Sequence, residues 1–239
     1  MKTADYIIRW SIALVFFMLI FCAVAIGLLF TSPQQVCVIV KPLCRAMILA
    51  IGVRVRVRGQ DRFATDRPYL IICNHESLLD PFLCTGMIPL CFVGIELDEH
   101  FSWPVWGWLT RRWGNIPLNR DSHRTVRTSF RVAQQRLAEG TSILIFPEGE
   151  RTVTGDLLPF KKGAFHLARQ ARADILPVAI RGLHLAKTRG DWRVRAVNVS
   201  VAFGAPLAYR EYRDWTVEEL RDWGQRTIAS LRGEHKING

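Results

Sequence analysis

The stretch YLIICNHESLLD, residues 69–80, joins an apolar run directly to a cluster of polar side chains. Its first five residues are apolar, which is typical of a strand that is buried on both faces of a sheet. In α/β folds, the polar residues that follow such a strand lie where ligands collect and where catalytic side chains are displayed. The stretch therefore predicts an α/β fold with a functional site at the end of this strand.

Apolar and alternating runs predict further strands along the chain. The segment VRVRVRG, residues 53–59, alternates strictly and places its valines toward the core and Arg54, Arg56 and Arg58 toward solvent. Short apolar runs predict the remaining strands at residues 90–93, 113–117, 141–146, 175–181 and 194–203. Helical patterns lie between several of them, at residues 122–139, at residues 162–172 and from Thr216 onward. This alternation predicts a mixed central sheet flanked by helices.

Two of the predicted helices carry end signals. Gly140 is expected to end the helix over residues 122–139, and Glu219 stands at the capping-box position relative to Thr216 in the last helix. Within residues 122–139, the spacing of apolar residues predicts four core positions, Val126, Val132, Ala133 and Leu137.

The amino terminus is the most apolar part of the chain. Residues 10–30, WSIALVFFMLIFCAVAIGLLF, carry no charge, and as a helix they would be roughly 31 Å long, close to the hydrocarbon thickness of a bilayer. The run is longer than the apolar core of a secretory signal, and no A-x-A-like cleavage site follows it. We therefore expect a membrane anchor that remains on the chain.

A second apolar segment, VCVIVKPLCRAMILAIGV at residues 36–53, contains Lys41, Pro42 and Arg45. Two charges and a central proline favour an interfacial or kinked helix beside the first one over a second free-standing span. The anchor is then either a single span or a hairpin that enters one leaflet and returns. The sequence thus predicts membrane-anchoring helices over residues 1–52 and a catalytic domain over residues 53–239.

The chain is strongly basic, with a formal net charge of +11 and an isoelectric point near 9.9. This charge indicates an anionic partner, which is a nucleic acid, a phosphate-bearing substrate or an acidic membrane surface. Nucleic-acid binding is supported by charge alone, because the sequence contains no recognised nucleic-acid-binding motif.

All six cysteines fall within the first 91 residues and form no C-x-x-C pair. This pattern favours neither a disulfide framework nor a zinc site. We expect the cysteines to be unpaired, buried apolar side chains in a reducing compartment, and we expect no metal.

Three polar clusters follow predicted strands: NHESLLD at residues 74–80, GNIPLNRD at residues 114–121 and FPEGERT at residues 146–152. In the first cluster, His75 is a candidate general base, and Asp80 is expected to orient it across a turn and a helix start. No G-x-S-x-G elbow surrounds the neighbouring serine, Ser77, so a helix cap is predicted there in preference to a nucleophile.

The other two clusters contribute candidate binding residues. Arg120 and Arg151 come from separate loops and offer planar guanidinium groups that could clamp a phosphomonoester. Glu148 is expected to accept a hydrogen bond from a substrate hydroxyl, and Gly149 to let the backbone approach a ligand closely. Lys161, in LPFKKGAF, adds a cation near a helix start, where anions are favoured.

These clusters, together with LLPFKKGAF and ILPVAI, follow one another over residues 69–180 and resemble the lysophosphatidic acid acyltransferase family, the membrane-bound 1-acylglycerol-3-phosphate O-acyltransferases. The resemblance implies a glycerolipid acyltransferase-like α/β fold. It also implies an enzyme of phospholipid biosynthesis that moves a fatty acyl group from acyl-CoA or acyl carrier protein to the sn-2 hydroxyl of lysophosphatidic acid, giving phosphatidic acid. The thioester is a co-substrate, and no cofactor is implied.

The resemblance also assigns roles to residues. His75 would deprotonate the glycerol hydroxyl, which attacks the thioester directly, and Asp80 would orient the imidazole. The residues that resemble the family's glycerol-phosphate binders are Arg120, Glu148, Gly149, Arg151 and Lys161. The family often has a lysine after the next strand, and this chain has Ile95 near that position.

Three alternatives remain open at this point. The acceptor could be another lysolipid, such as a lyso-ornithine lipid; the protein could bind membrane lipids without catalysis; or Ser77 could serve a lipid hydrolase. We expect the protein at the inner (cytoplasmic) membrane with its catalytic domain facing the cytoplasm, in contact with a lysophospholipid, an acyl donor and the bilayer, and with no nucleic acid.

Overall fold

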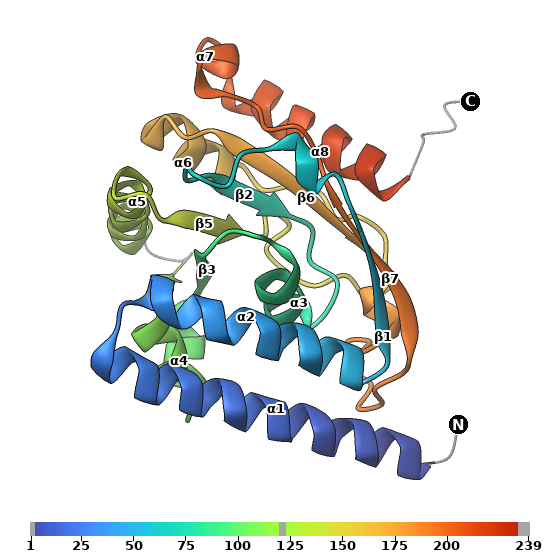
Figure 1. The fold of residues 1–239 in the computed structure, drawn as a ribbon. Helices are drawn as coiled ribbons and strands as arrows, with labels where there is room; N and C mark the ends of the chain where they lie inside the picture. Colours follow the sequence, from blue (N-terminus) through green and yellow to red (C-terminus); the bar gives the residue numbers. More distant parts are fainter. Residues whose placement is uncertain (1–2, 120–122, 234–239) are drawn as a thin grey trace, which may run out of the picture.

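The structure, a computed structural model, describes residues 3–119 and 123–233, and their strands form one seven-stranded sheet (Figure 1). The strands are β1 (Val53–Arg58), β2 (Leu70–Cys73), β3 (Phe92–Leu97), β4 (Ile116–Leu118), β5 (Ser142–Ile145), β6 (Ile175–Arg181) and β7 (Val197–Phe203). They lie in the order β1-β7-β6-β2-β5-β3-β4, and β6 and β7 are antiparallel while the other neighbouring pairs are parallel. The predicted mixed sheet is confirmed.

Helices cover both faces of this sheet (Figure 1). The helices are α1 (Thr3–Phe30), α2 (Pro33–Ala50), α3 (Asp80–Met87), α4 (Trp106–Trp113), α5 (His123–Ala138), α6 (Gly163–Ala171), α7 (Tyr209–Tyr212) and α8 (Val217–Arg232). One hydrophobic core lies between the sheet and α1 to α4, and a second lies between the opposite face and α5, α6 and α8. Successive residues of β2 show the division, because Ile71 belongs to the first core and Ile72 to the second.

The predicted elements are correct in kind and less accurate at their ends. The predicted strand over residues 113–117 is wrong in its first half, because Trp113 ends α4 and Gly114, with a φ of 93°, turns the chain before β4 begins. Similarly, β3 begins and ends later than the predicted strand over residues 90–93, and β7 begins three residues after Val194. The capping box is confirmed, since the Thr216 hydroxyl accepts the N3 amide at 3.2 Å.

One predicted core position in α5 is wrong. Val132 is exposed, whereas Phe130, Ala133 and Leu137 are buried and Val126 packs against the same core. These buried residues recur at helical spacing on one face, which faces β5 and α6. Val132 lies outside that face.

The first two helices pack against each other as an antiparallel hairpin along one side of the molecule (Figure 1). Within the described residues, α1 is the one helix long and apolar enough to cross a membrane, and only 17% of its most apolar window is buried inside the protein. This exposure distinguishes α1 from an ordinary core helix and indicates membrane association. As predicted for the second segment, α2 retains Pro42 within a helix that packs beside the first.

Two arginines of the sheet hold the carboxyl end of α8. Arg58 donates a hydrogen bond to the carbonyl of Leu231, and Arg181 Nη1 donates one to the carbonyl of Arg232 at 2.9 Å. The last carbonyls of a helix lack intrahelical partners and carry the negative end of its dipole, so both guanidinium groups stabilise this end. Of the three outward-facing arginines predicted in residues 53–59, Arg58 therefore has a structural partner, the carbonyl of Leu231.

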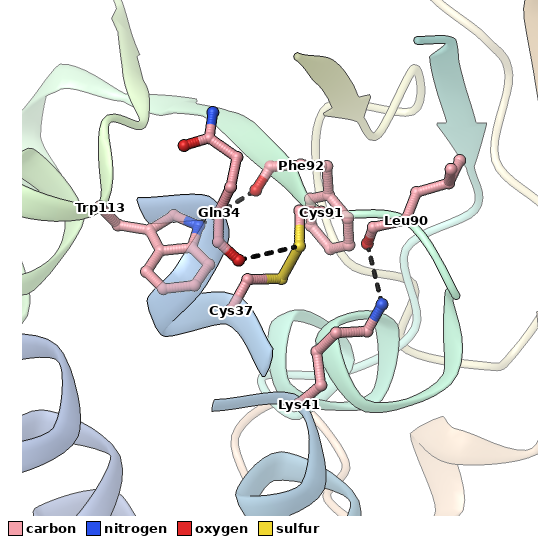
Figure 2. Close-up of a disulfide and its surroundings, with 7 residues drawn as sticks. All are labelled: Gln34, Cys37, Lys41, Leu90, Cys91, Phe92 and Trp113. Carbon is pink, nitrogen blue, oxygen red and sulfur yellow. Dashed lines mark hydrogen bonds between the residues drawn. A yellow bond between two sulfur atoms is a disulfide. The ribbon is translucent and has the colours of Figure 1, made fainter. Parts of the chain in front are cut away.

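The expectation that all six cysteines are unpaired is wrong, because Cys37 and Cys91 form a disulfide (Figure 2). Cys37 lies in α2 and Cys91 directly precedes β3, so packing of the helix hairpin against the sheet brings together residues 54 positions apart. Nearby, Lys41 Nζ donates a hydrogen bond to the carbonyl of Leu90 at 3.2 Å. The other cysteines are free; Cys44, Cys73 and Cys84 are buried, as predicted, and Cys22 is exposed.

Replacing Cys37 with alanine is expected to lower the free energy of unfolding by about 4 kcal/mol, because a cross-link across 54 residues restricts the unfolded chain. Denaturation of the detergent-solubilised protein under non-reducing conditions measures the effect. Cys22→Ala, on the exposed side of α1, is the matched control and should leave stability unchanged. Equal stability of the two variants would show that the disulfide contributes nothing.

Candidate active site

The site begins where β2 leaves the sheet. Asn74 extends the pairing with β6 through its side chain, since its Nδ2 donates to the carbonyl of Ile180 at 2.9 Å and its Oδ1 accepts the Ile180 amide at 2.7 Å. These two bonds give the backbone amide and carbonyl of Ile180 hydrogen-bond partners where β2 ends. The next residue, His75, begins the loop that precedes α3. Asp80 is the first residue of α3.

His75 and Asp80 are in direct contact, as the sequence predicts. Asp80 Oδ2 lies 2.5 Å from His75 Nδ1 and also accepts the amides of Glu76 and Ser77 at 2.7 and 2.9 Å. The two amides hold the carboxylate in place as an acceptor. His75 Nδ1 therefore carries a proton and donates a hydrogen bond to Asp80. His75 Nε2 is therefore left as an acceptor.

The imidazole is fixed on its face as well as on its Nδ1 edge. Phe146, which follows β5, stacks on the His75 ring with a centroid separation of 4.2 Å and an interplanar angle of 13°. The His75 side chain is 20% exposed, and Nε2 has no hydrogen-bond partner among the described residues. This arrangement leaves a rigid imidazole with one basic nitrogen accessible to a substrate.

Glu148 joins the first and third polar clusters. It is buried, and its two carboxylate oxygens accept the backbone amides of His75 at 2.6 Å and Leu158 at 2.8 Å. Burial raises the pKa of Glu148 to about 7, although both amide bonds and the charge of Arg232 act in the opposite direction. In this structure Glu148 ties two loops together, and its contact with a substrate hydroxyl remains a prediction.

The raised pKa of Glu148 predicts a pH-dependent stability. Between pH 4.5 and about 7 the folded protein keeps a proton that the unfolded chain releases, so this contribution is full below pH 4.5 and is lost as the pH rises through 7. The free energy of unfolding of the wild type, relative to Glu148→Gln, is expected to fall by about 3 kcal/mol over this range. Urea titrations at several pH values measure the difference.

Glu150→Gln is the matched control for that experiment, because Glu150 lies on the same loop with an exposed side chain. It should keep the pH dependence of the wild type. An unchanged pH dependence in Glu148→Gln would contradict the prediction.

The remaining predicted site residues occupy the same loop and its flanks. Gly149 has a φ of 78°, so glycine is needed there for the turn after β5. Arg151 is half-buried two residues further on, and Lys161 is exposed, with its amide bonded to the carbonyl of Pro147 at 2.8 Å. Arg120 lies outside the described residues.

Lys187 is a further candidate site residue, which the sequence alone does not reveal. Burial, followed by the positive charge of Arg151, lowers the pKa of Lys187, so a second cation lies near Arg151. The Ser77 hydroxyl donates to the carbonyl of Lys187 at 3.1 Å, so the prediction that Ser77 caps a helix is wrong. No sequence motif marks Lys187, because it approaches the site through the loop after β6.

Glu76 is a second buried carboxylate beside His75, and no sequence motif marks it. Its carboxylate is buried, accepts the amides of Leu183 and His184 at 2.7 and 3.2 Å, and lies 3.4 Å from Arg232 Nη2. Burial raises its pKa. Separately, no group of three or more metal-ligating side chains occurs within residues 3–119 and 123–233.

These features define the class of the protein: an α/β protein with an apolar amino-terminal helix and a paired histidine and aspartate at the end of a central strand. Residues 54–181, more than half of the chain, match the protein-family model described as Acyltransferase. The chain belongs to the acyltransferase family, which confirms the resemblance seen in its sequence.

The named relatives that resemble this chain are 1-acyl-sn-glycerol-3-phosphate acyltransferases. The chain is 36% identical over 205 residues to 1-acyl-sn-glycerol-3-phosphate acyltransferase alpha of Ovis aries, covering 82% of this chain and 70% of the relative. It is 33% identical over 178 residues to the 1-acyl-sn-glycerol-3-phosphate acyltransferase of Limnanthes douglasii, covering 74% of this chain. The chain spans 62% of that plant protein's length.

A solved structure shares the fold. The crystal structure of the 1-acyl-sn-glycerophosphate acyltransferase PlsC from Thermotoga maritima superposes with a TM-score of 0.81 at 23% sequence identity. The match covers 98% of this chain and 99% of that one, so the similarity extends over the amino-terminal helices as well as the sheet.

Proposed function

We propose that the protein transfers a fatty acyl group from acyl-CoA or acyl carrier protein to the sn-2 hydroxyl of lysophosphatidic acid, giving phosphatidic acid. The observation that carries the proposal is the contact between His75 and Asp80, which leaves a basic nitrogen accessible at the end of β2. Relatives that carry the same activity in their names support the choice of substrates.

The geometry accounts for direct transfer. His75 Nε2 takes the proton of the acceptor hydroxyl as its oxygen attacks the thioester carbonyl, and Asp80 stabilises the imidazolium that forms. The carbon–sulfur bond then breaks, and the departing thiolate takes the proton back from His75. The stacked ring of Phe146 limits rotation of the imidazole, so the base is positioned before the substrate binds.

The phosphate of the acceptor gives the second part of the proposal. Arg151, with Lys187 nearby, supplies positive charge on the loop that Glu148 ties to His75. A phosphate bound there would hold the glycerol hydroxyl near the base. We assign acceptor binding to this loop, together with Gly149, Lys161 and Arg120.

We further propose that residues 1–52 anchor a catalytic domain formed by residues 53–239. An aromatic cluster connects the two parts, because Trp106 of α4 lies 6.4 Å from Phe17 of α1 and 6.0 Å from Phe82 of α3, measured between ring centroids. Phe82 is two residues from Asp80, so this apolar contact leads from the membrane helix toward the site. The inner membrane with the domain facing the cytoplasm agrees with cytoplasmic acyl donors and a basic body.

The proposal is tested by acyl transfer with the detergent-solubilised full chain. Radiolabelled acyl-CoA and acyl carrier protein are each supplied with lysophosphatidic acid or with lyso-ornithine lipid. Product from lysophosphatidic acid is the expected result. Product from lyso-ornithine lipid alone would keep the mechanism and replace the acceptor, and folded protein that binds lipid without transfer in any pairing would favour the non-catalytic alternative.

A further inference from the structure

Arg232, the last residue of α8, is buried beneath the active site. Its side chain is 4% exposed, although arginine is usually found at the surface. Its Nη2 lies 3.4 Å from Glu76 Oε1 and donates a hydrogen bond to the carbonyl of Gly155. One guanidinium group therefore contacts the segment that carries the base and the loop that carries Arg151.

The contact with Glu76 bears directly on the base. Glu76 adjoins His75, and its amide donates to the Asp80 oxygen that also holds the imidazole. The Glu76 carboxylate accepts the amides of Leu183 and His184 in the loop after β6. A shift of Glu76 would therefore displace the His75–Asp80 pair.

The contact with Gly155 fixes the other loop. The amide of Gly155 donates to the Thr152 hydroxyl at 3.0 Å, and the Thr152 amide donates to the carbonyl of His75 at 3.0 Å. Gly155 has a φ of 92°, and a Cβ atom there would lie 2.3 Å from the His184 ring, so the loop packs closely on its neighbour. Arg151 is carried by this same loop.

Arg232 also supplies charge where several carboxylates are buried. Glu76, Asp80 and Glu148 are each at most 2% exposed. Burial raises the pKa of Glu76 and of Glu148, and the Arg232 charge opposes this rise in both. Removal of the guanidinium would leave these carboxylates without that compensation.

We propose that Arg232 is a positioning residue for acyl transfer, which sets the loop that binds the acceptor phosphate against the segment that carries His75. This inference rests on the proposed function and extends it to a residue outside the matched family segment, residues 54–181. The carboxyl-terminal helix then takes part in acceptor binding without touching the acceptor.

The test compares Arg232→Met with Arg226→Met, an exposed arginine on the same helix. In Arg232→Met we expect the KM for lysophosphatidic acid to rise about 10-fold and kcat to fall about 10- to 100-fold, with the KM for acyl-CoA unchanged. Partial unfolding alone would lower kcat without raising one KM selectively. Arg226→Met should match the wild type, and Arg232→Lys, which keeps the charge, should recover part of the loss.

A double-mutant cycle tests the route through Glu76. If Arg232 acts through that carboxylate, the variant with both Glu76→Gln and Arg232→Met loses little more than the worse single variant. Losses that multiply across the two sites would overturn this route.

A second readout does not depend on activity. Hydrogen–deuterium exchange of residues 150–158 should be faster in Arg232→Met than in Arg226→Met, because the loop loses its anchor at Gly155. Unchanged exchange together with unchanged acceptor KM would overturn the inference. An inactive wild type would instead reject the proposed function, and the exchange comparison would still decide the role of Arg232.

Discussion

Replacement of His75 with alanine is expected to lower kcat for acyl transfer by about 10³-fold while leaving the fold intact. In the proposed mechanism the imidazole accepts the hydroxyl proton, and general-base catalysis of this kind contributes roughly 10²- to 10⁴-fold. The ring is partly exposed, and its loss removes the stacking on Phe146 and one hydrogen bond to Asp80, whose Oδ2 keeps the amides of Glu76 and Ser77. Steady-state rates at saturating substrate concentrations measure the fall in kcat, and circular dichroism of the same preparations checks that the fold is intact.

Ser77→Ala is the informative comparison, because a hydrolase that used Ser77 as its nucleophile would lose all activity in that variant. The Ser77 hydroxyl donates to the Lys187 carbonyl, so its removal is expected to cost about 1 kcal/mol of stability and little activity. Full activity of His75→Ala would refute the base assignment, and release of free fatty acid abolished by Ser77→Ala would support the hydrolase.

Replacement of Asp80 with asparagine is expected to reduce kcat by roughly 10²- to 10⁴-fold, because it removes the negative charge that, in the proposed mechanism, stabilises the imidazolium. An asparagine oxygen can still accept the amides of Glu76 and Ser77, so the turn before α3 should persist. Asp80 Oδ1 is buried with no hydrogen-bond partner in the described part of the chain, and the new amide would place two unpaired donors there. A modest loss of stability should therefore accompany the loss of activity.

Asp214→Asn, on the exposed surface, is the matched control for charge removal and should keep both rate and stability. If Asp80→Asn retained more than a tenth of the wild-type kcat, the carboxylate would serve to shape the turn and would not stabilise a charged imidazole.

The sequence predicts those parts of the structure that depend on local pattern. The strand before Asn74 and the strands after residues 140 and 174 are continuous apolar runs, and they pair at the centre of the sheet as β2, β5 and β6. The His75–Asp80 contact is also local, since a tight turn and a helix start bring the two side chains together. Such features can be predicted from neighbouring residues alone, without knowing which distant segments pack together.

The features that sequence reasoning missed depend on contacts between distant segments. Arg232 looks like one more basic residue at the end of an amphipathic helix, and only the packing of α8 on β6 places it under Glu76. Cys37 and Cys91 likewise have no shared motif, and their pairing follows from how α2 lies against the sheet. The predicted strand over residues 113–117 begins too early for a different reason. Gly114 turns the chain through a left-handed conformation, which a pattern of apolar residues does not reveal.

The redox state of the Cys37–Cys91 pair in the cell should show which side of the membrane the sheet faces. Cytosolic glutathione and thioredoxin keep protein thiols reduced, whereas compartments outside the cytosol, such as the periplasm or the lumen of the endoplasmic reticulum, are oxidising. Acid quenching of intact cells, followed by alkylation under denaturing conditions, would therefore trap Cys37 and Cys91 as free thiols if the sheet faces the cytosol, and as a disulfide if it faces outward. Because the candidate active site shares that sheet, the oxidation state of these two sulfur atoms would also indicate on which side of the membrane the proposed reaction takes place.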